Sequence, residues 1–149
     1  MANEFVMVLP FDEECKDIVV IKKLRPKWQE GKFNCPGGSL EKTDASSGYG
    51  AKRELREETG IDPTCSMRFV CTVHWMDSSY VTTAKCHVFS LFSDEIYKAE
   101  TKEDEQVSIM KVSEFLALSD DQIIPDLRWL IPMAIQGVTA KELYIRKVN

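Results

Sequence analysis

The segment over residues 53–61 constrains the fold of this chain more than any other part of the sequence. Its three glutamates, Glu54, Glu57 and Glu58, are three and four positions apart, so a helix gathers their carboxylates on one face. Like charges at this spacing destabilise a helix by about 0.2–0.5 kcal/mol per pair. Such a local conflict indicates a cationic partner for the three carboxylates.

Glycines mark where this helix is expected to begin and end. Gly48 and Gly50 weaken a helix interior, so we expect the helix to start late, near residues 47–50. Gly60 stands where a helix C-cap belongs, and Pro63 prevents the helix from continuing. The sequence therefore predicts one short helix that carries all three glutamates.

The chemistry of these side chains favours a hard divalent cation. Oxygen-only ligands suit Mg²⁺ or Mn²⁺ better than zinc, and no nearby histidine or cysteine has the spacing of a zinc site. The alternative is a solvated, charge-laced helix in which Arg53 and Arg56 pair with the glutamates. The surrounding glycines, among them the turn Gly37-Gly38, favour a site that holds metal against phosphate.

These residues resemble a family signature. Gly38, Asp44 and the run over residues 53–61 are similar to the motif of the Nudix hydrolases, the MutT-like pyrophosphatases. That motif is a glycine, five residues, a glutamate, seven residues, and then Arg-Glu-apolar-any-Glu-Glu-any-Gly-apolar. This chain departs from it twice, because Asp44 replaces the first glutamate and eight residues separate it from Arg53. The resemblance implies an α/β fold, the Nudix-type α/β/α sandwich with a mixed sheet.

The resemblance also implies roles for individual residues. Metal ligation falls to the helix glutamates, the backbone carbonyl of the glycine turn and a downstream acid, namely Glu54, Glu57, Glu58, Gly38 and Glu105. Glu54 is also expected to orient or deprotonate the attacking water, and Arg53 to position a carboxylate by a charge-assisted hydrogen bond. Glu103 is the substitute if the acidic loop shifts. The implied Mg²⁺ or Mn²⁺ neutralises phosphate oxygens and lowers the pKa of a bound water that attacks phosphorus.

Two further segments narrow the resemblance to the oxidised-purine nucleoside triphosphatases of this family. Asn34 and Asp126 match an asparagine and an aspartate that read the base edge in those enzymes. Ile124 replaces their stacking tryptophan, and Leu127 replaces their second aspartate. The alternative for Asn34 is a turn residue, and for Asp126 an acid in the first helical turn that interacts with the helix dipole.

A basic connector over residues 22–32 carries further candidates for substrate binding. Trp28 can stack on a base or ribose, while Arg25, Lys27 and Lys32 can contact phosphates. The alternative is that Trp28 packs over the sheet and the cations stay solvated. The sequence leaves both interpretations open.

Composition agrees with one Nudix domain over residues 1–149, because a chain of this length with 44% hydrophobic residues can form a core. The net charge of −5 argues against stable nucleic-acid binding but permits a small-molecule nucleotide substrate carried with its metal. Five cysteines without a CxxC pair indicate reduced thiols and a cytoplasmic protein. We expect neither secretion nor membrane insertion, since no basic-then-apolar start and no spanning apolar run are present. A monomer and a homodimer both remain open.

The remaining pattern predicts a mixed α/β chain. Apolar runs predict strands over residues 5–9, 17–24, 68–75, 82–92 and 106–112, of which the last ends the sheet. Pro125 stands at a first helical position, so we expect a second helix over residues 125–136. The two helices are expected on opposite faces of the sheet.

The predicted reaction is hydrolysis of a phosphoanhydride in a nucleoside diphosphate linked to another group. The leading substrate is a nucleoside triphosphate, modified purines included, which yields the monophosphate and pyrophosphate. The second candidate is ADP-ribose, a dinucleoside polyphosphate or an RNA cap, for which the connector is suited. The third is a noncatalytic nucleotide-sensing module, which the presence of all three glutamates disfavours.

Overall fold

The structure, a computed structural model, describes residues 3–146. The strands are β1 (Asn3–Phe11), β2 (Asp17–Lys22), β3 (Phe33–Asn34), β4 (Gly37–Ser39), β5 (Arg68–Met76), β6 (Thr82–Phe92), β7 (Gln106–Lys111) and β8 (Glu142–Arg146). The helices are α1 (Ser47–Thr59), α2 (Val112–Leu116) and α3 (Leu127–Gln136), with 3-10 helices η1 (Lys27–Gln29) and η2 (Asp94–Lys98).

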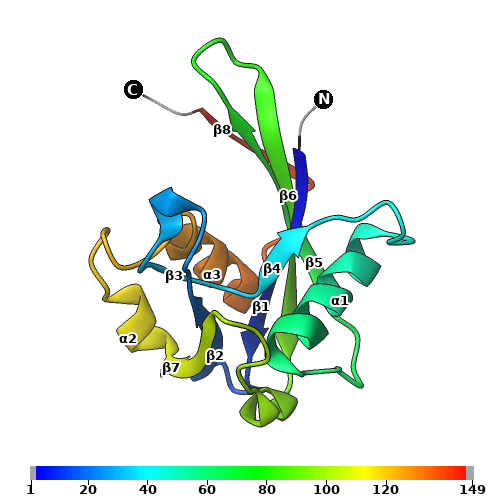
Figure 1. Cartoon of the computed structure of the whole chain (residues 1–149), viewed down its shortest axis with the longest axis vertical. Coiled ribbons are helices and arrows are strands. Elements are labelled where there is room, and N and C mark those ends of the chain that lie inside the picture. The colour runs from blue at the N-terminus through cyan, green and yellow to red at the C-terminus, as the bar shows by residue number, and fades with distance from the viewer. Residues whose placement is uncertain (1–2, 147–149) are drawn as a thin grey trace.

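All eight strands belong to one sheet, in the order β3-β2-β1-β6-β5-β8, with β4 paired to β1 and β7 paired to β2 (Figure 1). The pairs β1–β6 and β5–β8 are parallel and the others are antiparallel. The sheet is therefore mixed, as predicted.

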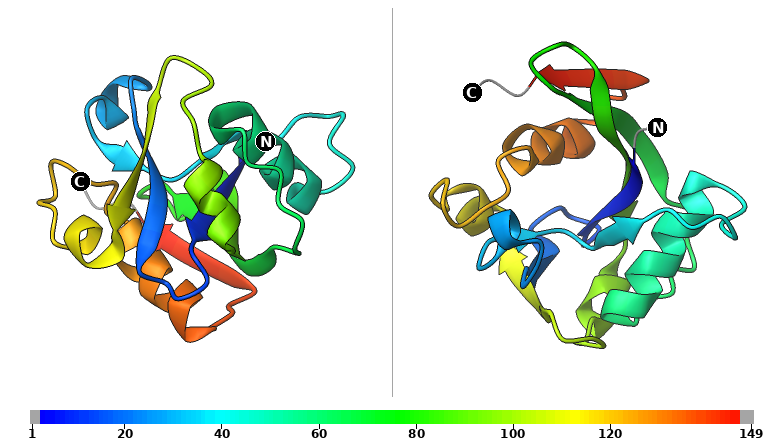
Figure 2. Two further views of the ribbon diagram at one scale, coloured as in Figure 1. Left: turned by 90° about the horizontal axis from the view of Figure 1, so that it is seen from below. Right: turned by 45° about the horizontal axis from the view of Figure 1, so that its top comes forward.

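Side chains of the central strand β1 alternate between two apolar cores. Val6 and Val8 pack with Leu55 of α1, whereas Met7 and Leu9 pack with residues of α3 on the opposite face. Figures 1 and 2 show these two helices on either side of the sheet. The predicted α/β/α sandwich is confirmed.

Several element boundaries differ from the sequence prediction. The strand predicted over residues 106–112 is not the last one, because β8 follows it, and Val112 already belongs to α2. The second helix begins at Leu127 rather than Pro125. Its entry is a tight turn in which the N–H groups of Leu127 and Arg128 donate to the carbonyls three residues earlier.

No helix within residues 3–146 has the length and apolar character that crossing a bilayer requires. All five cysteine thiols are free.

Candidate active site

The helix α1 is capped at both ends, at its C-terminus by the glycine that the sequence indicated. Ser46 caps its start, where the Oγ accepts a hydrogen bond from the Tyr49 N–H at 3.1 Å. Gly60 ends it with a left-handed backbone, φ +76°, and its N–H donates to Arg56 O. A Cβ on Gly50 would lie 2.8 Å from Asp44 Oδ2, so this glycine lets the preceding loop pack against the helix. The predicted late start at residues 47–50 is confirmed.

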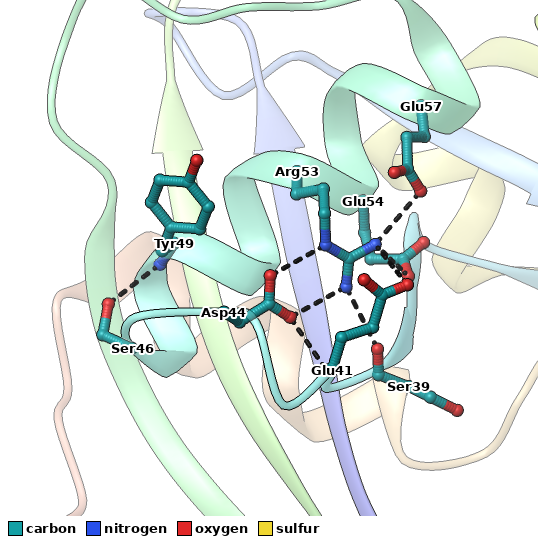
Figure 3. Close-up of polar contacts among 8 residues, drawn as sticks. All are labelled: Ser39, Glu41, Asp44, Ser46, Tyr49, Arg53, Glu54 and Glu57. Atoms are coloured by element: carbon teal, nitrogen blue, oxygen red, sulfur yellow. Dashed lines mark hydrogen bonds and ion pairs between the residues drawn. The ribbon is translucent and has the colours of Figure 1, made fainter.

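Arg53 is the hub of the site (Figure 3). Its Nε and Nη2 donate to the two oxygens of Asp44, both at 2.9 Å, and its Nη1 donates to Glu54 Oε1 at 3.0 Å and Glu57 Oε2 at 3.1 Å. A fifth contact joins Nη2 to the carbonyl of Ser39 at 3.2 Å. One guanidinium therefore ties the loop before α1, the end of β4 and two glutamates together.

Asp44 is the fixed partner of this guanidinium. Its side chain is only 1% exposed, and its Oδ2 also accepts from the Glu41 N–H at 2.8 Å. The hydrogen bonds from Arg53 hold the pKa of Asp44 at about 2, so the carboxylate stays charged. Despite the additional residue of the loop, both oxygens of Asp44 accept from Arg53.

Glu58 is the most buried of the three glutamates, with 8% exposure. Its Oε1 accepts a hydrogen bond from the Gly37 N–H at 2.8 Å. The pKa of Glu58 is raised to about 8, because burial, together with the negative charge of Glu54, outweighs the hydrogen bond from the Gly37 N–H. Burial also raises the pKa of Glu54, against the hydrogen bond from Arg53. Both carboxylates thus lack a cationic counterpart strong enough to offset their desolvation.

The predicted glycine turn is a short strand, β4, in which each of the two glycines lies close to a different group. A Cβ on Gly37 would overlap the carbonyl oxygen of Val6, so this glycine lets β4 pair with β1. A Cβ on Gly38 would lie 2.5–2.8 Å from the carboxylate atoms of Glu54. Gly38 therefore lets an acidic side chain lie directly against the backbone.

The acidic loop before β7 is fastened to the end of β2. Glu105 Oε1 accepts from Lys23 Nζ at 2.9 Å and its Oε2 accepts from the Leu24 N–H at 2.6 Å, with the carboxylate 12% exposed. Arg25 forms an ion pair with Asp104 in the same loop. Both Glu105 oxygens thus face the connector.

Glu103 is near enough to α1 for its charge to act on two of the glutamates. After burial, its negative charge is one of the causes that raise the pKa values of Glu54 and Glu58. The sequence named Glu105 first and Glu103 as its substitute, and both assignments stay predictions, because the charge of Lys23, the partner of Glu105, also acts on Glu58.

The donor set fits a hard divalent cation. The three glutamates offer only oxygen, two of them have raised pKa values, and Gly38 leaves room for a carboxylate at the backbone. Within residues 3–146, no three acidic, histidine or cysteine side chains are already arranged around a metal position. Arg53 contacts one oxygen each of Glu54 and Glu57, and the Gly37 N–H contacts one oxygen of Glu58, which leaves the other oxygen of each carboxylate to bind a cation.

The family model for the NUDIX domain matches residues 3–130 of the chain. The chain belongs to the NUDIX family. The predicted class, a Nudix pyrophosphohydrolase that acts on acid anhydrides, is confirmed, and hydrolases of this family generally use divalent metals. No curated protein sequence matches this one.

Solved structures show the same Nudix fold. The NUDIX domain of Shewanella oneidensis NrtR, complexed with ADP ribose, is 18% identical over 93% of this chain and 90% of that one, with a TM-score of 0.75. A bifunctional NMN adenylyltransferase/ADP ribose pyrophosphatase from Francisella tularensis, complexed with AMP and a Mn ion, is 19% identical over 93% and 42%, with a TM-score of 0.70. A MutT structure from work on Aliivibrio salmonicida and Vibrio cholerae is 20% identical over 89% and 98%, with a TM-score of 0.65.

In this Nudix domain, Asn34 and Asp126 lie on segments that are hydrogen-bonded to each other, through the Ile124 N–H and Phe33 O at 3.1 Å. Asn34 belongs to β3 and not to a turn; its Nδ2 donates to Gln29 Oε1 at 3.1 Å, and its Oδ1 accepts from the Cys35 N–H at 2.8 Å. Asp126 is at the N-cap of α3 but makes no capping hydrogen bond.

Asp126 is instead held by a residue that the sequence analysis missed. Trp75 of β5 donates its Nε1–H to Asp126 Oδ2 at 2.8 Å. No local pattern joins two residues that are 51 positions apart, so only the fold brings them together.

The connector candidates point outward. Trp28 is 63% exposed, so it does not pack over the sheet, and the side chain of Arg25 is 61% exposed despite its ion pair with Asp104. The fold brings neither residue to the glutamates of α1.

Removing the charge of Glu58 is expected to stabilise the metal-free protein at high pH. A glutamate with a folded pKa of about 8 and an ordinary value of 4.5 favours the folded state fully only below pH 4.5, and this contribution is lost as pH rises to about 8. Glu58→Gln keeps an acceptor for the Gly37 N–H without that loss, so its advantage should grow to a few kcal/mol by pH 9. Urea unfolding in EDTA at pH 5, 7 and 9 measures it, with exposed Glu114→Gln as control. Parallel curves for the wild type and Glu58→Gln would contradict the burial argument.

Proposed function

We propose that the chain hydrolyses a nucleoside triphosphate, with purine and modified purine bases included, to the monophosphate and pyrophosphate, using Mg²⁺ or Mn²⁺. This proposal rests mainly on the position of two side chains. Asn34 and Asp126, which accepts a hydrogen bond from Trp75, lie on segments that are hydrogen-bonded to each other. Asn34 also stands three positions before Gly37, whose N–H donates a hydrogen bond to Glu58. Three residues span at most about 10 Å, a separation that suits a base joined to the reacting phosphates by one sugar.

We assign a role to each acidic side chain and to Arg53 from its position in the site. Glu57 and Glu58, with the Gly38 carbonyl, would hold the metal, and Glu103 is the downstream acid that we propose in preference to Glu105. When bound, the metal neutralises phosphate oxygens and acidifies water. Arg53 positions Glu54 and Glu57 through its two Nη1 contacts.

Glu54 is the proposed general base. Its Oε1 is held by Arg53, which leaves Oε2 to accept a proton from water. Burial raises the pKa of Glu54 above its ordinary value, against the hydrogen bond from Arg53, which makes this carboxylate a stronger base.

A second candidate, ADP-ribose, is favoured by the exposed connector. Trp28 and Arg25 stand outside the site with 63% and 61% exposure, where a second ribose and its phosphate could reach them. Hydrolysis would then give AMP and ribose 5-phosphate, two products that chromatography separates from pyrophosphate.

Base reading is tested by two substitutions. Asp126→Asn keeps an acceptor for Trp75 but changes the group offered to a base, and Asn34→Ala removes the amide. Each is expected to lower kcat/KM for the preferred nucleoside triphosphate about tenfold, the cost of one unpaired hydrogen bond. Steady-state kinetics on canonical and oxidised nucleoside triphosphates, ADP-ribose and dinucleoside polyphosphates measure this.

Trp28→Ala is the matched control. It should leave triphosphate turnover unchanged and lower turnover only of a substrate that extends to the connector. Wild-type kcat/KM in both Asp126→Asn and Asn34→Ala, or turnover of ADP-ribose alone, would reject the triphosphate assignment.

A further inference from the structure

The strand β8 ends the sheet and has one free edge. It pairs with β5 in parallel, with Glu142 opposite Thr72 and Tyr144 opposite His74. Figure 2 shows it at the periphery of the molecule. Within residues 3–146 no further strand pairs with it. Edges of this kind pair readily with another chain unless they are blocked.

The backbone of β8 offers a regular set of hydrogen-bonding groups. The Thr72 N–H donates to Lys141 O at 3.2 Å, which fixes the peptide groups that face β5. Because successive peptide groups of a strand point to opposite sides, those of Glu142, Tyr144 and Arg146 point outward. The strand contains neither a proline nor a bulge that would protect this edge.

The side chains of β8 are self-complementary. In an antiparallel pair of two such strands centred on Tyr144, Glu142 lies opposite Arg146 of the partner subunit, and Leu143 lies opposite Ile145 of the partner subunit. Each contact then occurs twice, as a two-fold axis requires. Opposite charges and matched apolar side chains are the favourable cross-strand pairs of a sheet.

The central side chain is already oriented for such a contact. Tyr144 stacks on His74 with ring centroids 4.5 Å apart and remains 57% exposed. Arg146 lies over the ring of Tyr80 at 4.3 Å and donates to its hydroxyl at 2.9 Å, which fixes the guanidinium and leaves further donors for a carboxylate.

We propose that β8 is the interface of a homodimer, in which the edge strands of two copies pair antiparallel about Tyr144 and extend the sheet. Glu142 and Arg146 lie at equal distances on either side of Tyr144. Pairing with a different protein would not require this symmetric arrangement, whereas pairing with a second copy of this chain does. A five-residue edge is a small interface. The dimer therefore dissociates on dilution.

Charge reversal tests this register. Glu142→Arg and Arg146→Glu each place like charges opposite one another, and each is expected to raise the dimer dissociation constant at least about tenfold. An equimolar mixture of the two variants places arginine opposite glutamate at both contacts, so it should recover the wild-type dissociation constant as a heterodimer. Sedimentation velocity of the full chain over a concentration series, with circular dichroism to confirm folding, measures all four samples.

Glu114→Arg, an exposed charge reversal on α2, is the control and should dimerise like the wild type. A wild-type chain that is monomeric at every concentration overturns the proposal, as do single variants that dimerise normally or a mixture that fails to recover.

Discussion

Glu58→Gln is expected to lower metal-dependent kcat by about 10²–10⁴, the range associated with loss of a group that acts on the reacting atoms. Glu58 is buried, its pKa is raised to about 8 by burial, and its Oε1 is held at 2.8 Å from the Gly37 nitrogen. A metal-bound site needs the charged form of this carboxylate, which glutamine cannot provide. Initial rates at saturating Mg²⁺ on the preferred substrate measure the loss.

The amide is nearly the same size as the carboxylate and keeps an acceptor for Gly37, so the fold should be unchanged. Glu114→Gln, with its exposed side chain on α2, controls for loss of one negative charge and should keep wild-type rates. Near-normal turnover in Glu58→Gln, with an intact circular dichroism spectrum, would remove Glu58 from the metal site.

Gly38→Ala is expected to reduce kcat by at least about tenfold with only a small loss of stability. Its Cβ would lie 2.5–2.8 Å from the Glu54 carboxylate, so the carboxylate must move away from the backbone. The displaced atoms are the far end of a flexible side chain, which can rotate at modest cost. Misplacement of a catalytic group by a fraction of an ångström reduces rate strongly.

Alanine substitutions at two other glycines distinguish this effect on catalysis from a general loss of stability. Gly37→Ala drives its Cβ into the Val6 carbonyl oxygen and should destabilise the fold by about 1–3 kcal/mol, because backbone must shift. The Cβ of Gly48→Ala would make only ordinary van der Waals contacts, 3.6 Å from the ring of Phe89 and 3.9 Å from Ser46 Oγ, and the substitution should stabilise α1 by about 0.5–1 kcal/mol. Thermal unfolding and kcat together distinguish the three. Wild-type kcat in Gly38→Ala would mean that Glu54 need not lie against β4.

The sequence predicted the motif helix closely because its boundaries are set locally. Ser46 and Gly60 cap it through contacts within four residues, and the three glutamates follow helical spacing. The faces of the sheet were also predictable, since alternation along β1 separates Val6 from Met7.

Nonlocal pairing explains what the sequence did not predict. Gly37-Gly38 has low strand propensity, yet it forms β4 because only glycine fits beside the Val6 carbonyl. The pairing of β8 with β5 joins residues about 70 positions apart, as Thr72 and Glu142 show.

The contacts of the acidic residues before β7 also depend on nonlocal pairing, so the sequence did not predict them. Spacing alone could not decide which member of the acidic loop faces the site. Lys23 pairs with Glu105 and Arg25 pairs with Asp104, whereas Glu103 acts on Glu54 and Glu58 through its charge.

The most direct measurement is the product analysis of nucleoside triphosphate hydrolysis with and without Mg²⁺, for the wild type and Glu58→Gln side by side. We expect equal amounts of monophosphate and pyrophosphate from the wild type, only when Mg²⁺ is present, and formation of both products at least about a hundredfold slower in Glu58→Gln. Three results would contradict the assignment of this three-glutamate site. They are release of a nucleoside diphosphate and inorganic phosphate, turnover in EDTA, and equal turnover by the variant.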